Sequence, residues 1–232
     1  RRDVSRRSAA LLWRMADATL RAMDPGGIPD SDADADDRLG GHLAAGWAAY
    51  RAADLVAGLR EAHAAVALAP RHGEAWYMFA FHLERCGRTG QADRCFVRAA
   101  RAAVDPQDPP YRIPFARFRV LVDAAAADLP PRLRAGFDEV SLVLADYAEP
   151  GLLEGMDDVE LLGLFTGTPR PELSAGADFP GITPSIHLFR RAHEHHCGSR
   201  AEMAAEVRRT LFHEFGHYLG YDEDDLTAMG LE

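Results

Sequence analysis

The chain has 232 residues, of which 47% are hydrophobic, and this is enough for one full-sized domain or two compact ones. Its net charge of −10 repels phosphate backbones, so we expect no nucleic acid among its partners. No apolar run approaches the roughly 18 residues that span a bilayer, and the N-terminal segment lacks the apolar core of a secretory signal. We therefore expect a cytoplasmic protein with no membrane partner.

The N-terminal part of the chain is rich in Ala, Leu, Arg and Glu with helical periodicity, from residue 8 to residue 103. A first helix is expected at about Ser8 to Met23. The acidic stretch Asp30 to Asp37 lacks apolar anchors, so we expect a solvated loop there.

An internal repeat follows this stretch. Shifting residues 46–70 by 34 positions aligns Gly46 with Ala80, Gly58 with Ala92, Ala62 with Phe96, and Ala65 with Ala99. A period of 34 residues is typical of the tetratricopeptide repeat. The second copy resembles that family at Trp76, Ala80, Gly87, Ala92, Phe96 and Ala99. The resemblance implies an all-α repeat region over about 40–104, which either binds a protein partner or serves as a packing platform.

A domain boundary is predicted near Asp105 to Pro110, because three prolines in five residues cannot continue a helix. We expect a helical domain over 1–108 and a second domain over 109–232. The second domain begins with an amphipathic segment, Phe115 to Ala127, and its strand-like runs are Val140 to Ala145, Leu161 to Thr166 and Ser185 to Phe189. Helices framing a small sheet predict an α+β fold. If the strand at 185–189 lies at the sheet edge, it can bind an extended peptide.

A long helix is predicted from Ser199, whose hydroxyl can cap it while Glu202 reaches back, to Gly220. His213 and His217 are one turn apart on it, so both imidazoles can hold one metal ion. The apolar residues fall on the opposite face: Val207, Leu211, Phe215 and Tyr218.

Glu214 is offset from His213 by about 100° around this helix, so its carboxylate can reach a metal-bound water without becoming a ligand. This spacing recurs in zinc hydrolases for two reasons. Two neutral imidazole ligands leave the zinc ion a strong Lewis acid, and the glutamate accepts the proton from the water that the ion activates. The alternative is a surface helix with two solvated histidines.

A third protein ligand is expected at a catalytic zinc. Gly220 can adopt a positive φ and turn the following acidic residues back toward the histidines. Glu223 lies ten positions after His213, at the last position of the extended motif His-Glu-x-x-His-x-x-Gly-x-x-ligand, and Asp222 is the alternative. Gly216 is expected to keep the metal cleft open.

Other polar residues have both a functional and a structural interpretation. Tyr218 or Tyr221 can donate a hydrogen bond to a tetrahedral intermediate, or either can simply pack. The cluster His193 to Cys197 lacks helical spacing that converges on one ion, so we predict a polar turn leading into the long helix, with an accessory metal site or a cleft-lining loop as alternatives.

Residues 115–232 resemble the minimal zincin-like metallopeptidases, a compact bacterial family. The resembling stretches are Leu129 to Arg134, Val140 to Leu144, Leu161 to Gly167, Ile186 to Arg190 and Glu206 to Gly220. The resemblance implies a compact domain with a small sheet and an active-site helix. It also implies zinc held by His213, His217 and the acidic residue at 223, with Glu214 as the base. That family commonly has Asp at the third ligand position, which keeps Asp222 as an alternative.

The sequence thus predicts a zinc metallopeptidase of the endopeptidase type that hydrolyses a protein or peptide substrate, which the helical-repeat domain recruits or gates. The alternatives are a catalytically silent helical-repeat adaptor with a zincin-like interaction module, and a hydrolase of a non-peptide bond with the same ligands.

Overall fold

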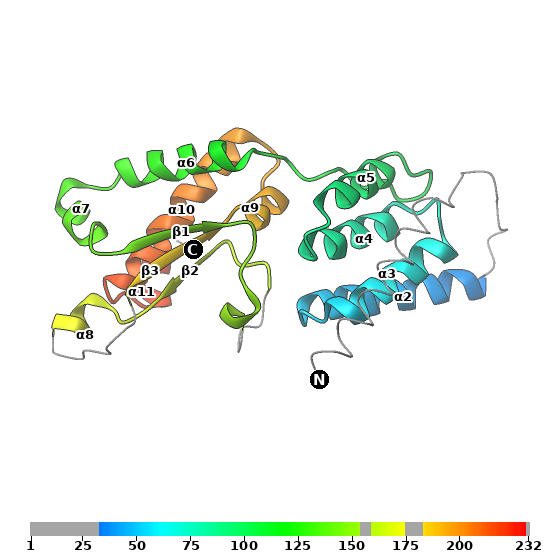
Figure 1. Cartoon of the computed structure of the whole chain (residues 1–232), viewed down its shortest axis with the longest axis horizontal. Helices are drawn as coiled ribbons and strands as arrows, with labels where there is room; N and C mark the ends of the chain where they lie inside the picture. The colour runs from blue at the N-terminus through cyan, green and yellow to red at the C-terminus, as the bar shows by residue number, and fades with distance from the viewer. Residues whose placement is uncertain (1–32, 154–158, 175–182, 231–232) are drawn as a thin grey trace. The chain divides into compact units, whose positions relative to one another are not determined.

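The computed structural model describes residues 33–153, 159–174 and 183–230 (Figure 1). The chain divides into two compact units whose main boundary lies between Pro109 and Pro110. The helix predicted at residues 8–23 lies outside the described residues.

The first unit is built from helices that pack in chain order. Their bounds are α2 (Ala33–Arg51), α3 (Leu55–Leu68), α4 (Gly73–Arg85) and α5 (Thr89–Ala100). Helix α2 packs against α3 and α4 packs against α5, while α3 contacts α4. The described part of this unit is therefore helical, as its periodicity predicts.

The acidic loop predicted at Asp30 to Asp37 is wrong for its described part, because α2 already begins at Ala33. Asp34 and Asp36 lie in the first turn of α2. Carboxylates are favourable there because the N-terminal end of a helix carries a partial positive charge. Acidic composition alone therefore did not distinguish a loop from a helix start.

Small residues allow the helices of the first unit to approach closely. A Cβ atom on Gly58 of α3 would overlap the imidazole of His82 on α4. The alanines at the aligned repeat positions are all fully buried: Ala62, Ala65, Ala80, Ala92 and Ala99. The residues that recur with the 34-residue period thus lie in the core of this unit.

The second unit combines helices with a three-stranded sheet. Its strands are β1 (Ser141–Ala145), β2 (Gly163–Thr166) and β3 (Ser185–Phe189). Its α-helices are α6 (Phe115–Ala127), α7 (Pro131–Phe137), α8 (Arg170–Ser174), α9 (Arg190–His196), α10 (Arg200–Tyr218) and α11 (Glu223–Ala228), and a 3₁₀ turn spans Pro150–Leu152. The α+β class predicted from the sequence is confirmed.

One face of this sheet is covered by α10, which packs on β2, β3 and α6 (Figure 1). The main core joins alternate strand residues such as Ile186 and Leu188 to Val207 and Leu211 of α10. Phe189 points to the other face, where it packs with Ala148 and Ala192 in a smaller cluster. The alternation expected of strands thus separates two apolar layers.

The strand order is β1-β3-β2, with β1 parallel and β2 antiparallel to the central β3. Peptide binding at Ser185–Phe189 is expected only if that strand lies at the sheet edge, and this condition is not met because both of its sides are already hydrogen bonded. Strand β2 is an edge strand of this sheet instead. Throughout the described ranges, every helix is too short or too polar to span a lipid bilayer.

Candidate metal centre

Helix α10 positions the histidines because its ends and its buried face are both fixed. The Ser199 side chain accepts a hydrogen bond from the Glu202 backbone N–H at 3.2 Å, as predicted for its first turn. Val207, Leu211 and Phe215 are buried against the sheet and α6. This packing fixes the rotation of α10 about its axis and leaves His213 and His217 partly accessible.

The two histidines present their ring nitrogens to each other. Nε2 of His213 lies 3.1 Å from Nε2 of His217. Nδ1 of His217 lies 3.2 Å from the backbone oxygen of Tyr221. With Nδ1 as the donor in that contact, the lone pair of Nε2 is available to a metal, as in zinc sites whose histidines donate their other nitrogen to a carbonyl.

Glu223 joins this pair from the first turn of α11. Its Oε1 lies 3.3 Å from Nε2 of His217 and its Oε2 lies 3.7 Å from Nε2 of His213. Gly220, at φ +90°, makes the turn that brings α11 back to α10. Among the described residues, His213, His217 and Glu223 form the one set of three such side chains whose ligand atoms lie within 4.8 Å of one another.

Asp222, the alternative ligand, has a different partner. Its Oδ1 accepts a hydrogen bond from the Asp225 backbone N–H at 2.9 Å, and the Asp225 carboxylate accepts one from the Asp222 backbone N–H. This reciprocal pair is a capping box that begins α11. The cap orients the first turn of α11 and so directs the neighbouring Glu223 toward the histidines.

These distances fit a zinc ion. Tetrahedral bonds of about 2.0–2.1 Å place neighbouring ligand atoms about 3.3 Å apart. The two histidine nitrogens lie 3.1 Å apart, and a Glu223 oxygen lies 3.3 Å from His217 and the other 3.7 Å from His213, all close to that value. Two imidazoles and one carboxylate are also a ligand set that catalytic zinc uses, with a fourth position left for water or substrate.

Glu214 is buried beside the histidines, with 8% of its surface exposed. The backbone N–H of Phe165 on β2 donates a hydrogen bond to its Oε2 at 2.7 Å. Burial raises the pKa of the Glu214 carboxyl, while His213, His217 and the Phe165 N–H oppose that rise. A carboxyl with a raised pKa is better matched to exchanging protons near neutral pH.

Gly163 allows this close contact between β2 and α10. A Cβ atom at residue 163 would lie 2.6 Å from Cγ2 of Thr210 and 2.9 Å from Cγ of Glu214. Sequence reasoning missed both Gly163 and Phe165 as site residues. The glycine within the apolar run Leu161 to Phe165 was the available signal, because an isolated glycine in a strand often marks a close approach of another element.

The two candidate tyrosines lie in different surroundings. Tyr218 is buried, and its hydroxyl donates to Oε2 of Glu139 at 2.6 Å. Burial and this hydrogen bond raise its pKa to about 12. Tyr221 is 42% exposed and lines a pocket together with His217. The hydroxyl of Tyr218 therefore has a structural partner, whereas Tyr221 faces the cleft beside the histidines.

Gly216 is small for a reason other than the one expected. A Cβ atom there would overlap the side chain of Leu226 on α11, so the glycine permits α11 to pack against α10. Leu226 is fully buried in this contact. Gly216 therefore supports the centre through helix packing, and the expectation that it keeps the cleft open is corrected.

The predicted polar turn at His193 to Cys197 is wrong, because residues through His196 form the end of a short helix in which His193 and Glu194 are buried. Residues through His196 belong to α9, and Glu194 is 0% exposed. The Glu194 carboxylate accepts hydrogen bonds from Arg112 at 2.8 Å, from Arg191 at 2.6 Å and from the Ile113 N–H at 2.9 Å.

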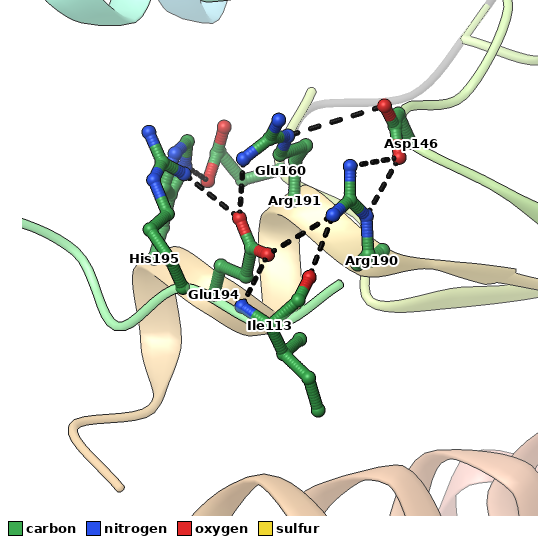
Figure 2. Close-up of polar contacts among 8 residues, drawn as sticks. Ile113, Asp146, Glu160, Arg190, Arg191, Glu194 and His195 are labelled. Atoms are coloured by element: carbon green, nitrogen blue, oxygen red, sulfur yellow. Dashed lines mark hydrogen bonds and ion pairs between the residues drawn. The ribbon is translucent and has the colours of Figure 1, made fainter. Parts of the chain in front are cut away.

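A wider network surrounds Glu194 (Figure 2). Arg190 donates to Asp146 at 2.8 Å and to the Ile113 backbone oxygen at 2.6 Å, and His195 pairs with Glu160 at 3.1 Å. These contacts pair the charges inside the protein and allow a polar sequence to be buried. The cluster thus ties α9 to the segment that enters this unit.

Comparison with known proteins agrees with the geometry of the centre. Residues 137–231 match the family model described as a zincin-like metallopeptidase. The matched segment begins at the last residue of α7 and continues past α11, so it contains both histidines, Glu214, Asp222 and Glu223. Zincin-like metallopeptidases generally bind zinc. No curated protein matches the chain.

Proposed function

We propose that the protein is a zinc-dependent metallopeptidase that hydrolyses peptide bonds of a protein or peptide substrate. The observation that carries this proposal is the convergence of His213, His217 and Glu223 beside a buried Glu214, within a segment that matches zincin-like metallopeptidases. In this proposal the first three residues hold the ion and Glu214 is the base.

The fit of the ligand distances supports zinc as the cofactor. When bound, zinc would supply a Lewis acid that lowers the pKa of water and polarises the scissile carbonyl. Oε1 of Glu214 would accept the proton from the attacking water, because Oε2 is held by the Phe165 N–H. The same carboxyl would then pass a proton to the departing amine nitrogen.

The open edge of β2 supports a peptide as the substrate. The Leu162 carbonyl accepts a hydrogen bond from the Phe189 N–H of β3 at 2.9 Å. In an antiparallel pair the backbone groups of alternate residues point toward and away from the partner strand, so those of Phe165 point away from β3. Its N–H reaches Glu214, and its carbonyl, which points away from β3, would remain for an added strand. An extended peptide paired with this edge would lie beside the catalytic carboxylate.

Tyr221 is the better placed of the two tyrosines for an auxiliary role. It lines the pocket that also contains His217, and Tyr218 is held by Glu139. We assign Tyr221 the donor role toward a tetrahedral intermediate.

The helical unit has a proposed role of its own. Helices α2 to α5 would form two tetratricopeptide-like helix pairs, supported by the burial of the alanines that recur with the 34-residue period. These pairs would recruit or gate the protein substrate. Deleting residues 1–108 should reduce capture of that substrate while leaving zinc stoichiometry at one per chain.

The decisive experiment uses Glu214→Gln as a trap. The zinc-loaded variant should bind substrate proteins and release them intact, and wild-type protein should cleave what the variant captures. Glu214→Gln should retain one zinc per chain and lose at least about 100-fold in kcat, the contribution typical of a positioned general base. Zinc binding without cleavage of any captured protein would favour a silent adaptor with a zincin-like interaction module.

A further inference from the structure

A pocket of about 430 Å³ opens beside His217. One part of its wall comes from the apolar residues Phe165, Pro169 and Pro171, and Tyr221 also lines it. Since His217 belongs to the metal triad, a substrate side chain in this pocket would lie next to the scissile bond. The pocket is therefore placed to select a residue that flanks that bond.

Close backbone packing fixes the walls of this pocket. Gly220 follows α10 at φ +90°, and a Cβ atom there would lie 2.8 Å from Cγ of Pro171. Gly167 follows β2 at φ +122°, and its Cβ would lie 2.9 Å from Cα of Pro184. Neither glycine therefore has room for a side chain, and these close contacts place the turn after α10 against Pro171 and the turn after β2 against Pro184.

Apart from the proposed metal ligand His217, the charged side chains that line the pocket are carboxylates. Glu172 of α8 and Asp222 both line it, and neither Arg nor Lys does so among the described residues. Glu172 forms no ion pair with a described side chain, whereas the nearby Arg170 is paired with Glu139 at 3.1 Å. A cation entering the pocket would therefore meet carboxylate without displacing an existing partner of Glu172.

We propose that this pocket binds a basic substrate side chain, arginine or lysine, at a position flanking the scissile bond. The aliphatic stem would lie along the prolines and Phe165, as long basic side chains do on apolar surfaces. The cationic end would meet Glu172 and the face of Tyr221. This inference rests on the proposed peptidase function and adds its substrate class.

A binding measurement tests the pocket without requiring turnover. The probes are two fluorescein-labelled degenerate octapeptide mixtures, one with arginine fixed near the centre and one with its uncharged isostere citrulline. They are titrated against zinc-loaded Glu214→Gln protein. The arginine mixture should bind roughly fivefold more tightly, as expected for a partly solvated ion pair.

Two further variants assign this preference to the pocket. Adding Glu172→Gln to Glu214→Gln should bring the arginine-to-citrulline ratio close to one. Adding Asp123→Asn should leave the ratio at about fivefold, because Asp123 is an exposed carboxylate on α6 outside the pocket. If the arginine-to-citrulline ratio fell equally in both variants, the assignment of the preference to this pocket would be overturned, and a general effect of net charge would be indicated.

Cleavage of a proteome-derived peptide library by wild-type protein gives an independent readout. Mass spectrometry should find arginine or lysine enriched at one position beside the cleaved bond, and Glu172→Gln should remove that enrichment. Cleavage without such enrichment overturns the pocket assignment and leaves the peptidase proposal standing. Failure of both peptide mixtures to bind also overturns the assignment, while cleavage of the library decides the peptidase proposal separately.

Discussion

The backbone N–H of Phe165 donates to Oε2 of Glu214 at 2.7 Å, although 49 positions separate the two residues in the chain. This contact joins the sheet edge to α10. It holds one carboxylate oxygen, so Oε1 is the oxygen that would exchange protons in the proposed reaction. It also brings the backbone of an edge strand next to the same carboxylate.

Gly163→Ala should disturb this contact. The added Cβ would lie 2.6 Å from Thr210 and 2.9 Å from Glu214, so β2 or the carboxylate must shift. We expect kcat to fall by about 10–100-fold, because small displacements of a catalytic group have effects of that order. Zinc affinity should remain within about threefold of wild type, since no metal ligand is touched. Steady-state kinetics and zinc competition titration measure the two effects.

Gly151→Ala is the matched control for that change. A Cβ atom at Gly151 meets nothing within 4 Å, so this variant should keep both kcat and zinc affinity. Equal kcat values for the two alanine variants would contradict the positioning role of β2.

Glu223→Gln should weaken zinc binding by at least about 10–100-fold. Loss of a residue that only hydrogen bonds to a metal ligand already has an effect of that size, and this change replaces a proposed charged ligand itself. Asp222→Asn should stay close to wild type, since asparagine also caps helices well. Competition with a zinc chelator at pH 7.5 measures both affinities. The reverse order of effects would identify Asp222 as the third ligand.

Glu194→Gln should lower the free energy of unfolding by about 3–5 kcal/mol, the range found when one partner of a buried ion pair is removed and the other charge stays buried. It leaves Arg190 and Arg191, each 9% exposed, without their shared carboxylate. Denaturant unfolding followed by far-UV circular dichroism measures the change.

Asp128→Asn is the control for Glu194→Gln. It removes a surface ion pair with Arg208, in which both side chains are at least half exposed. Such pairs contribute about 0–1 kcal/mol, so its unfolding transition should move little. If Glu194→Gln behaved the same way, the network in Figure 2 would contribute little to stability.

The first unit should lose stability below pH 6.5. Burial lowers the pKa of His82 to about 4, against an ordinary value of 6.5. The unfolded chain therefore binds a proton as pH falls from about 6.5 toward 4, before the folded protein does, and unfolding becomes more favourable. The contribution of His82 should decrease by about 2 kcal/mol between pH 7.5 and pH 5.

Tryptophan fluorescence can follow this loss because both described tryptophans, Trp47 and Trp76, lie in the first unit. His82→Gln should reduce the pH dependence, since its amide can replace Nε2, which lies 3.2 Å from the Gly46 oxygen. An unchanged slope between pH 7.5 and pH 5 in this variant would assign the effect to other groups.

Local patterns in the sequence were sufficient for the helix that carries the histidines. The cap at Ser199, the buried face through Leu211 and the turn at Gly220 all follow from residues close in the chain, and the structure agrees with each. The spacing of His213 and His217 likewise fixes both on one helix face. Helical geometry depends on neighbours within a few residues, so sequence alone determines it.

Contacts between segments that are distant in the chain could be identified only from the tertiary structure. Alternation predicted Ser185–Phe189 as a strand, yet only sheet pairing places it in the centre and β2 at an edge. Composition marked His193 to Cys197 as polar, yet Arg112 from a distant segment, together with Arg191 of the same helix, allows Glu194 to be buried.

The sequence by itself determined that two histidines and a glutamate share one turn of a helix. Only the tertiary structure decided that Phe165 holds Glu214 and that Glu223 turns toward the histidines while Asp222 caps α11. The physical reason is that spacing along a helix fixes directions within that helix. Strand register, the contact of Glu214 with β2 and the contacts of Arg112 and Ile113 with Glu194 depend on partners that the local sequence does not contain.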